Sequence, residues 1–363
     1  MEQFQLEEYL SNGVERILRN IIKISDPKGS LFLLKFMAAE KRTRIIREEA
    51  EVMGEHIPPF LIASITSKCN LHCKGCYARA NGACKEGFDS KELTGRQWGD
   101  IFGQAERLGI SFILLAGGEP LMRRDVIEEA GNHKGILFPV FTNGTMFDDD
   151  YLKMFAEKRN LLPVLSIEGD REQTDARRGF GIYFALNQTM KNFKKDGLLF
   201  GVSVTVTNEN LQEVTSEEFL DRLEENGCKA VVYVEYVPAD GKTENLAPGE
   251  RERQEFDRRL LKLRKKQEHM MFISFPGDEK ASGGCLAAGR GFFHINAAGG
   301  AEPCPFSPYT DTNLVHTSLR KALSSPLFLK LRGSGSLEEF HSGGCALFEK
   351  EQMVKGLLRG GEV

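Results

Sequence analysis

Long hydrophobic runs and a basic N-terminus are both missing from this sequence of 363 residues. Its longest apolar stretches, such as residues 31–34 and 112–116, are far shorter than the roughly 20 residues of a membrane-spanning helix. The first ten residues carry acids and no base, which is wrong for a signal or transit peptide. We therefore expect a cytoplasmic protein with no transmembrane segment, in a compartment that keeps thiols reduced.

An excess of positive charge is missing as well. The formal net charge is -4, so no overall field attracts nucleic acid or an anionic membrane, and we expect no nucleic-acid partner. What is present is an ordinary composition, 41% hydrophobic and 28% charged, in a chain long enough to bury a large core. Its size alone suggests about two domains.

Helix and strand patterns alternate through most of the chain, without internal repeats or low-complexity segments. Residues 12 to about 53 carry apolar residues at helical spacing and predict two amphipathic helices, which form an N-terminal region over residues 1–56. Further helices are predicted near residues 91–108, 123–133, 148–158, 182–196, 215–226 and 249–268. Apolar runs of strand length lie at residues 60–66, 111–117, 136–142, 161–167, 200–206 and 230–237.

These runs are apolar on both faces, which is typical of a parallel sheet covered by helices. The six units are too few for a closed eight-stranded barrel, so we expect an α/β fold with an open or partial barrel over residues 57–270. Ligands of such sheets bind at the carboxyl ends of the strands. After residue 270 the sequence becomes rich in Gly, Ala and Pro, which predicts a second, smaller domain over residues 271–363 that depends on bound metal.

Three of the eight cysteines lie within the stretch SKCNLHCKGCYA, directly after the first predicted strand. Cys69, Cys73 and Cys76 follow the spacing C-x3-C-x2-C. Three thiolates on a cubane iron–sulfur cluster leave one iron open for another ligand. A structural zinc ion needs four ligands, and His72 is the nearby fourth. From chemistry alone, a cluster, a zinc site and a coincidence of spacing all stay open.

This spacing, with the aromatic Tyr77 after the last cysteine, resembles the signature of the radical S-adenosylmethionine (radical SAM) superfamily. Its position after the first strand of a partial (β/α)6 barrel is that superfamily's position too. The resemblance implies a [4Fe-4S] cluster whose open iron is chelated by the amino and carboxylate groups of SAM. One electron then cleaves SAM to methionine and a 5′-deoxyadenosyl radical, which abstracts hydrogen from a substrate, as expected of an oxidoreductase.

The motif AGGEP (residues 116–120) closes the second strand and resembles the superfamily's Gly-Gly-Glu element. The resemblance assigns Gly117, Gly118 and Glu119 to the SAM methionine ammonium. Two glycines let the backbone approach a ligand closely, because no Cβ intervenes, and a carboxylate accepts hydrogen bonds from a cationic amine. Without its context, AGGEP is a strand-to-helix turn.

Three later motifs also resemble SAM-contacting elements of the superfamily. FTNGT (141–145) and SIEGD (166–170) assign Asn143 and Ser166 to the SAM ribose or carboxylate. The superfamily more often has Asp where this chain has Glu168, so no role is assigned to that residue. TDARRGFGIYF (174–184) assigns Arg178 to the SAM carboxylate, because a guanidinium fork suits a carboxylate, with plain surface charge as the alternative.

A second cysteine set lies in the terminal region. Cys285 and Cys304 fit C-x13-G-x4-C and resemble the opening of a SPASM domain, but of its later cysteines only Cys345 has a counterpart here. The pattern therefore resembles the shortened Twitch type, which holds one auxiliary iron–sulfur cluster. Its fourth position is either an open iron or a ligand such as His341 or Cys84; the alternative is three buried structural cysteines. Two further residues, Cys228 and His294, are expected to be buried interior side chains.

The resemblance spans residues 57–348 and implies a radical SAM enzyme with one auxiliary [4Fe-4S] cluster in its terminal domain. We expect a peptide or protein side chain as substrate, since SPASM-like domains accompany that work most often, and a low-potential electron donor such as a ferredoxin or flavodoxin. The alternative substrate is a small molecule, such as a cofactor, tetrapyrrole or lipid precursor. A non-catalytic iron–sulfur or zinc protein is a third hypothesis, which the Gly-Gly-Glu element disfavours because a metal carrier needs no methionine clamp.

Overall fold

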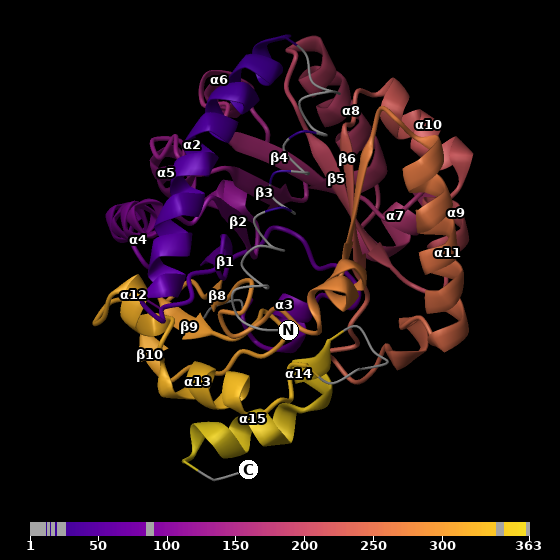
Figure 1. Cartoon of the computed structure of the whole chain (residues 1–363). Coiled ribbons are helices and arrows are strands. Elements are labelled where there is room, and N and C mark those ends of the chain that lie inside the picture. The colour runs from indigo at the N-terminus through magenta and orange to yellow at the C-terminus, as the bar shows by residue number, and fades with distance from the viewer. Residues whose placement is uncertain are drawn as a thin grey trace.

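The computed structural model of the chain describes residues 12, 15, 19, 27–84, 91–338 and 345–360. Within these residues one sheet of ten strands forms, in the order β10-β9-β8-β1-β2-β3-β4-β5-β6-β7 (Figure 1). The strands are β1 (Phe60–Thr66), β2 (Phe112–Gly117), β3 (Phe138–Thr142), β4 (Leu161–Ser166), β5 (Gly201–Val206), β6 (Ala230–Glu235), β7 (Met271–Phe275), β8 (His294–Ile295), β9 (Gly300–Glu302) and β10 (Thr312–Asn313).

Strands β1 to β7 are parallel, and each pairs with the next along the chain. All six predicted strands are confirmed, and β1 occupies the same residues, 60–66, as its prediction. The sheet differs from the prediction in having β7 as a seventh parallel strand, so it continues past residue 270 to residue 275. This strand is a run of only five residues, MFISF, and lies where the composition of the chain changes.

The terminal region joins the same sheet. Strand β8 pairs in parallel with the second edge of β1, and β9 and β10 continue from it in antiparallel pairs. The order of strands does not close on itself, since β7 and β10 are its two ends. The expected α/β fold with a partial barrel is therefore confirmed, with the terminal region extending its sheet on the β1 side.

Helices lie outside this curved sheet, with α2, α4, α5 and α6 on one side of Figure 1 and α8, α10 and α11 on the other. Helix α7 has no predicted counterpart, because only Thr174 of its residues is buried and no apolar periodicity marks it. The helices are α2 (Pro27–Val52), α3 (Tyr77–Ala80), α4 (Gly95–Leu108), α5 (Arg124–Ala130), α6 (Asp149–Glu157), α7 (Arg171–Arg178), α8 (Ile182–Lys195), α9 (Leu211–Val214), α10 (Glu217–Glu225), α11 (Glu250–Lys266), α12 (Leu319–Ala322), α13 (Pro326–Gly333), α14 (Ala346–Glu349) and α15 (Glu351–Leu358), with 3-10 turns η1 (Pro120–Met122), η2 (Glu244–Leu246) and η3 (Gly277–Ser282).

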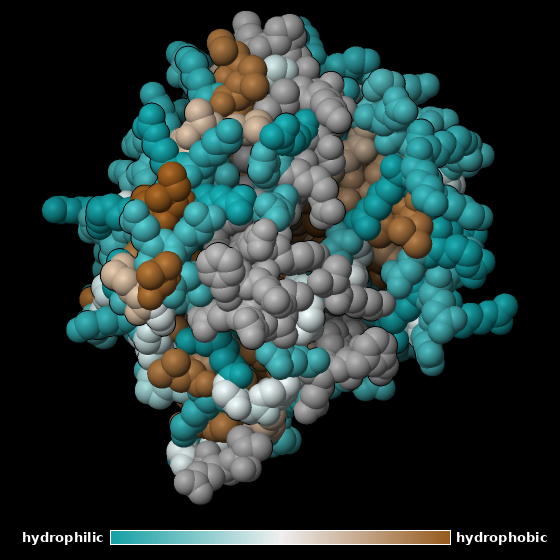
Figure 2. Space-filling view, in the orientation of Figure 1, coloured by the Kyte–Doolittle hydropathy of each residue, from teal (hydrophilic) through white to brown (hydrophobic). Residues whose placement is uncertain are grey.

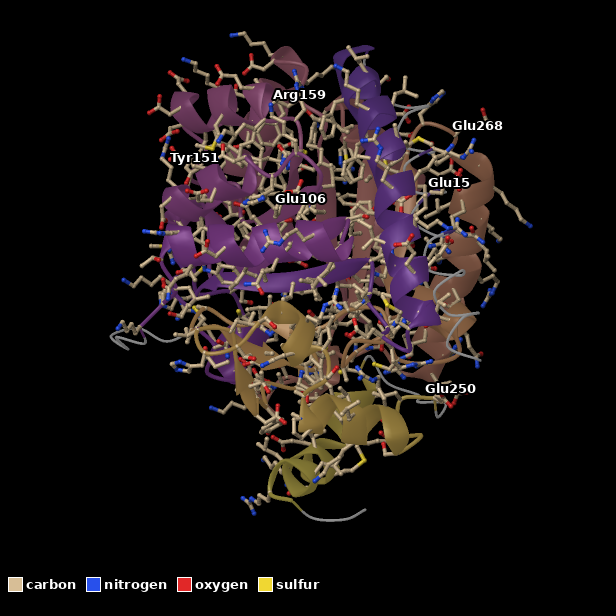
Figure 3. All side chains as sticks on the ribbon, turned by 60° about the vertical axis from the view of Figure 1, so that its left-hand side comes forward. Glu15, Glu106, Tyr151, Arg159, Glu250 and Glu268 are labelled. Carbon is tan, nitrogen blue, oxygen red and sulfur yellow. The ribbon has the colours of Figure 1, made fainter. Side chains whose placement is uncertain are left out.

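Polar contacts tie the helices to the loops at the strand ends. Glu106 of α4 accepts a hydrogen bond of 3.0 Å from the backbone N–H of Gly135, and Tyr151 of α6 donates one of 2.6 Å to the carbonyl oxygen of Leu121 (Figure 3). Leu121 lies two residues after Glu119 in the chain. The Tyr151 contact therefore helps to hold the loop after β2, which carries one of the predicted cofactor motifs.

One hydrophobic core runs through both the barrel and the terminal region. It includes barrel residues such as Leu61 and Val202 together with terminal residues such as Phe292, Phe328 and Leu357, all of them buried. The expectation that the terminal region is poor in apolar side chains is therefore wrong, while the dependence of its fold on metal stays a prediction. Its glycines lie in loops, while its short helices supply the apolar side chains that complete this core.

Helix α2 corresponds to the second of the two predicted N-terminal helices; the first lies almost entirely outside the described residues. The fully buried Arg47 fixes α2 to the barrel by donating to the carbonyl oxygen of Gly109, and it also donates to the carboxylate of Glu40 in the same helix. Two leucines of this helix, Leu31 and Leu34, are more than half exposed, and Figure 2 shows isolated hydrophobic patches on the side of the molecule where α2 lies. None of the described helices is both long enough and apolar enough to cross a membrane.

Candidate metal and cofactor site

The predicted cluster cysteines lie in one loop between β1 and α3, at the carboxyl end of the strand. Cys69, Cys73 and Cys76 are partly exposed and form no disulfide. The loop is held to α7 by a hydrogen bond of 2.8 Å from the backbone N–H of Lys74 to the carbonyl oxygen of Arg177. Among the described residues, no three or more His, Cys, Asp or Glu side chains lie close enough together to hold a single metal ion. A cubane sets a different requirement, because each thiolate binds a separate iron.

The surroundings of Cys69 and Cys73 raise the pKa values of their thiols. Burial raises the pKa of Cys69 to about 11. Burial also raises the pKa of Cys73, and the positive charges of Arg178 and Arg177 oppose that shift. Metal binding must therefore displace protons from Cys69 and Cys73, and the two arginines favour the thiolate form of Cys73.

Gly117 and Gly118 bring the loop after β2 against the cysteine loop. A Cβ at Gly118 would lie 1.9 Å from the carbonyl oxygen of Lys68, and one at Gly117 would lie 2.4 Å from that of Thr66. In the space that a side chain would fill, two backbone hydrogen bonds form instead, from Gly118 N to Thr66 O and from Glu119 N to Lys68 O. In this structure the glycines therefore serve contact between two loops, where the sequence suggested close approach to a ligand.

Glu119 is buried between the ends of β2 and β3. Its Oε1 accepts hydrogen bonds from Thr142 Oγ1 at 2.6 Å and from the backbone N–H of Leu121 at 3.1 Å, and its Oε2 accepts one of 2.8 Å from the backbone N–H of Asn143. Burial raises the pKa of the carboxyl group, against the effect of these bonds. A carboxylate has about four acceptor positions, so one remains for a cationic amine.

Asn143 connects the end of β3 with the cysteine loop. Its Nδ2 donates a hydrogen bond of 2.8 Å to Oδ1 of Asn70, while Asn70 donates in turn to Thr145 Oγ1. Asn70 had no predicted role, although it lies next to Cys69 inside the cysteine motif. The ends of β1, β2 and β3 are thus joined by side-chain and backbone hydrogen bonds into one unit.

Glu168 and Arg178 form a buried pair at the end of β4, next to the partly buried Ser166. Both Nε and Nη2 of Arg178 donate to Oε1 of Glu168, and Arg177 Nη1 donates to the same oxygen. The charge of Glu168 keeps the pKa of Arg178 raised although burial lowers it. Plain surface charge, the alternative for Arg178, is therefore wrong. Glu168, to which the sequence assigned no role, holds both arginines beside the cysteine loop.

Arg177 offers a free donor in this region. Its Nη1 also donates to Thr205 Oγ1 at 2.8 Å, and its guanidinium carbon lies 6.0 Å from the ring centre of Tyr236. Its buried Nε has no hydrogen-bond partner among the residues that the structure describes. Glu168 is already paired with both arginines, so the unpaired N–H of Arg177 can donate to another anionic group, such as the carboxylate of SAM. The sequence favoured Arg178 over Arg177 only because Arg178 precedes a glycine.

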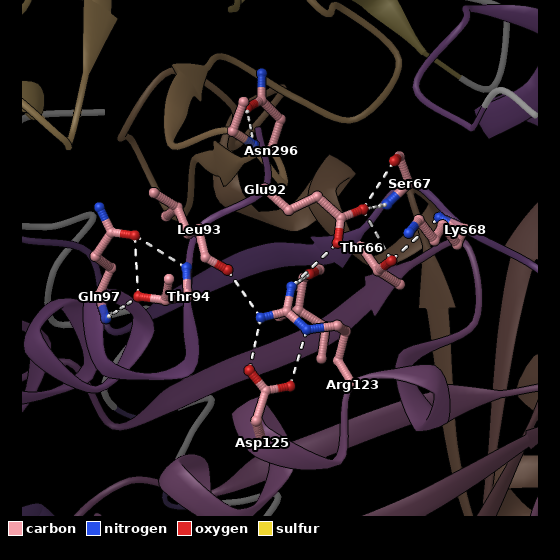
Figure 4. A network of polar contacts seen from close by, with 12 residues as sticks. Thr66, Ser67, Lys68, Glu92, Leu93, Thr94, Gln97, Arg123, Asp125 and Asn296 are labelled. Carbon is pink, nitrogen blue, oxygen red and sulfur yellow. Dashed lines mark hydrogen bonds and ion pairs between the residues drawn. The ribbon is translucent and has the colours of Figure 1, made fainter. Parts of the chain in front are cut away.

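Glu92 supports the start of the cysteine loop (Figure 4). Its Oε1 accepts hydrogen bonds from the backbone N–H of Ser67 at 2.7 Å, from Ser67 Oγ at 2.8 Å and from Thr66 Oγ1 at 3.0 Å. Its Oε2 accepts one of 3.1 Å from Arg123, which also binds Asp125. No motif marks Glu92 in the sequence, because this contact joins residues 25 positions apart.

Cys285, Cys304 and Cys345 are brought together in a buried group. Cys304 and Cys345 share a hydrogen bond between their thiols, and this bond, with burial, raises the pKa of Cys304 well above its usual range. Burial, together with Glu279 and Cys345, also raises the pKa of Cys285 well above its usual range. Burial also raises the pKa of Glu279 to about 8, and the sequence gave no role to this residue.

The remaining candidates lie elsewhere. Cys84 is buried and adds to the raised pKa of Cys69, so it lies by the first cysteine loop. His341 falls outside the described residues. Cys228 is a buried side chain that donates to the carbonyl oxygen of Ala230, and His294 is buried between Glu302 and Ser64 with both ring nitrogens engaged. The predictions for Cys228 and His294 are confirmed.

A family model described as the radical SAM superfamily matches residues 63–220 of this chain. The chain is 29% identical over 184 residues to the Fe-coproporphyrin III synthase of Methanosarcina barkeri, covering 50% of this chain but only 45% of that protein. It is 25% identical over 327 residues to the AdoMet-dependent heme synthase of the same organism, covering 82% of this chain and 90% of that protein. It is 26% identical over 277 residues to the mycofactocin maturase MftC of Mycolicibacterium smegmatis, covering 70% and 66%.

Solved structures of Streptococcus suis SuiB have a similar fold. The complex with S-adenosylmethionine matches with a TM-score of 0.68 at 17% identity, covering 84% of this chain and 77% of SuiB. The complex with the precursor peptide SuiA matches with a TM-score of 0.64 at 16% identity, covering 85% and 74%. At these identities the likeness concerns the fold.

Proposed function

Because this chain belongs to the radical SAM superfamily, whose enzymes use a [4Fe-4S] cluster and SAM, we propose that it cleaves SAM reductively and abstracts hydrogen from a peptide or protein side chain. One electron from the cluster supplies the cleavage of SAM into methionine and a 5′-deoxyadenosyl radical. That radical takes a hydrogen atom from the substrate and becomes 5′-deoxyadenosine. The observation that carries the proposal is the joining of the predicted residues at the ends of β1, β2 and β3 into one hydrogen-bonded unit, with the buried Arg177 Nε beside it.

Each side chain in this unit has a proposed task. Cys69, Cys73 and Cys76 bind three irons, and their thiolates form as the metal displaces protons. The remaining acceptor position of Glu119, with the backbone around Gly117 and Gly118, receives the ammonium of SAM. Asn143 and Ser166 contact its ribose or carboxylate, and Arg178, with Arg177, neutralises the carboxylate.

The terminal region has a separate proposed task. Cys285, Cys304 and Cys345 bind an auxiliary [4Fe-4S] cluster, and a low-potential donor such as a ferredoxin or flavodoxin supplies electrons. The burial of all three cysteines in one group supports this proposal over scattered structural cysteines. We divide the chain into N-terminal helices (1–56), a barrel and a terminal auxiliary-cluster domain. The pairing of β7 with β6 favours moving the second boundary from residue 270 to about residue 275.

A peptide substrate is supported by the likeness to SuiB, which was solved with its precursor peptide, and by the match to the maturase MftC. A second candidate is a tetrapyrrole. It is favoured by one observation, the match over 90% of the length of an AdoMet-dependent heme synthase. Cleavage of SAM is the same for both candidate substrates, so only an experiment that identifies the molecule losing the hydrogen atom distinguishes them.

The test is anaerobic incubation of the reconstituted protein with SAM and dithionite, followed by measurement of 5′-deoxyadenosine. Deuterium transfer into that product from labelled peptides would support the first candidate. Transfer only from a labelled coproporphyrin would replace it with the second. Absence of 5′-deoxyadenosine, or its persistence after Cys69, Cys73 and Cys76 are changed to Ala, would overturn the radical mechanism itself.

A further inference from the structure

Glu279 is a buried acid with an unused oxygen atom. It lies in the turn η3, directly after β7 and six residues before Cys285. Its side chain is buried, and its Oε1 has no hydrogen-bond partner within the described part of the chain. Leaving a buried polar atom unpaired is costly, so such an atom in a folded protein calls for an explanation, for example a bound ion.

The acid before it shows the contrast. Asp278 lies in the same turn, but its carboxylate accepts hydrogen bonds from the backbone N–H of Ser274 and from Arg264, and its side chain is 44% exposed. Asp278 therefore closes the turn from the outside. Glu279 is buried instead, and although the backbone N–H of Leu286 donates to its carboxylate, its Oε1 keeps no partner among the described residues.

The groups around Glu279 are the thiols of the terminal cysteines. Its carboxylate interacts with Cys345 and Cys285, and Cys285 in turn interacts with Cys304, so that one acid and three thiols share a buried space. The charge of Arg290 acts on both Glu279 and Cys285, and its Nη1 donates to the carbonyl oxygen of Cys285 at 2.6 Å. A second buried atom without a partner among the described residues, Ser307 Oγ, lies three residues after Cys304 in the chain.

The backbone fixes this arrangement. Ser282 Oγ donates to the carbonyl oxygens of Glu279 and Gly284, which sets the turn between Glu279 and Cys285. The next residues lie against the segment that leads toward Cys345, because Cys285 N donates to Leu337 O at 2.8 Å. A Cβ at Gly284 would come within 2.3 Å of that same oxygen, so only glycine fits there. The acid and the thiols are thus held together by the fold.

We propose that Glu279 is the fourth ligand of the auxiliary cluster, binding through Oε1 the iron that the three cysteines leave open. This inference rests on the proposed function, which puts a four-iron cluster at these cysteines. Four ligands on four irons complete the set that such clusters normally have. Carboxylate is a harder ligand than thiolate, so the iron that it holds is bound less strongly than the other three. Of the two alternatives, Cys84 acts on Cys69 in the first cysteine loop and not on Cys285, Cys304 or Cys345, and His341 lies outside the described residues.

The test uses the full chain with Cys69, Cys73 and Cys76 changed to Ala, so that the auxiliary cluster is the only one present. In this background we compare Glu279 with Glu279→Cys and Glu279→Ala, with Asp278→Asn as the matched control on the same turn. The readouts are iron and sulfide content, and electron paramagnetic resonance after mild oxidation, which reports conversion of a four-iron to a three-iron cluster. The midpoint potential is measured on the same samples.

We expect the fourth iron to be lost most readily from Glu279→Ala, less readily from the parent and least readily from Glu279→Cys, with Asp278→Asn equal to the parent. The midpoint potential of the cluster in Glu279→Cys should shift to more negative values, because the carboxylate is replaced by a softer, more electron-donating thiolate. If Glu279→Ala fails to fold, the comparison of the parent with Glu279→Cys decides. Equal iron loss and equal potential in all variants would overturn the assignment while leaving the auxiliary cluster in place; a background protein without iron would overturn the cluster and the ligand together.

Discussion

Glu119 accepts a hydrogen bond of 2.8 Å from the backbone N–H of Asn143, which joins the carboxyl ends of β2 and β3. The side chain of Asn143 extends this link to Asn70 in the cysteine loop, so a change at one strand end reaches the others. Parallel strands present their carboxyl ends at one edge of the sheet, where ligands of such folds bind. The Gly-Gly-Glu element is therefore both a structural tie and a candidate cofactor contact, and the two roles make different predictions.

We expect Glu119→Gln to lower both the stability of the protein and its affinity for SAM while leaving its iron content intact. The amide has one oxygen in place of two, so a donor from Thr142, Leu121 or Asn143 loses its acceptor. Hydrogen bonds to a charged group contribute about 1.5–3 kcal/mol, which corresponds to roughly ten- to hundred-fold in affinity. Equilibrium binding of SAM and thermal unfolding measure the two effects.

Thr142→Val is the matched control, since it removes one donor to Glu119 but leaves the carboxylate. If the carboxylate contacts SAM, Thr142→Val should lower stability with a much smaller loss of affinity. Equal losses of affinity in both variants would mean that Glu119 acts on SAM only through the fold. Unchanged affinity in both would make the motif a turn.

Gly118→Ala should disturb the cysteine loop. The new methyl group would lie 1.9 Å from Lys68 O, and the neighbouring atoms are backbone, which cannot move aside alone. We expect unfolding to become easier by about 1–3 kcal/mol, as for overpacking elsewhere, together with reduced iron at the first site. Gly356→Ala is the control: this exposed glycine of α15 has no heavy atom near its Cβ position, so the change should raise helix stability by up to about 1 kcal/mol. Normal iron content in Gly118→Ala would contradict the loop contact.

The strands of the barrel were predictable because their signals are local. Runs such as residues 60–66 are apolar over the length of a strand, and in the structure β1 is buried on both faces, as its sequence suggests. Helix α7 lacked a signal because it buries only one residue, Thr174. Its importance comes from Arg177 and Arg178 at its end, and their partner Glu168 is recognisable only once β4 and α7 are folded together.

The supporting acids were beyond the reach of the sequence. Glu92 meets Ser67 across a separation of 25 residues, and Glu279 meets Cys345 across a longer one, so no spacing rule marks either contact. Composition was misleading in the terminal region, where the glycines drew attention away from buried side chains such as Leu323 and Phe328. The cysteine motif itself was informative because its three ligands are adjacent in sequence.

The pH dependence of stability should include a contribution from Glu92. Burial alone would raise the pKa of this carboxyl, but the hydrogen bonds from Ser67 and Thr66 and the charge of Arg123 outweigh it and hold the pKa below its usual range. A lowered pKa in the folded state means that the carboxylate adds stability above the unfolded-state value of about 4.3 and that this is lost as the pH falls through the folded value. As the pH is lowered from about 5, the free energy of unfolding of the wild type should therefore fall more steeply than that of Glu92→Gln, which lacks this carboxylate. Denaturant titrations of both proteins at a series of pH values measure this; parallel curves would contradict the assignment.

Changing the terminal cysteines distinguishes two roles for the proposed auxiliary cluster: the metal either holds the fold of the terminal region or takes part in turnover. Apolar side chains of this region belong to the same core as the barrel, and β8 pairs with β1, so its fold does not rest on metal alone. Changing Cys285, Cys304 and Cys345 to Ala should leave a protein that resists proteolysis.

With two four-iron clusters the wild type should hold about eight irons and this variant about four. The variant should still cleave SAM without substrate, which needs only the first cluster, yet fail to complete turnover. Four irons in the wild type would remove the second site, whereas cleavage of the variant by protease from about residue 275 onward would restore the metal-dependent fold that composition suggested.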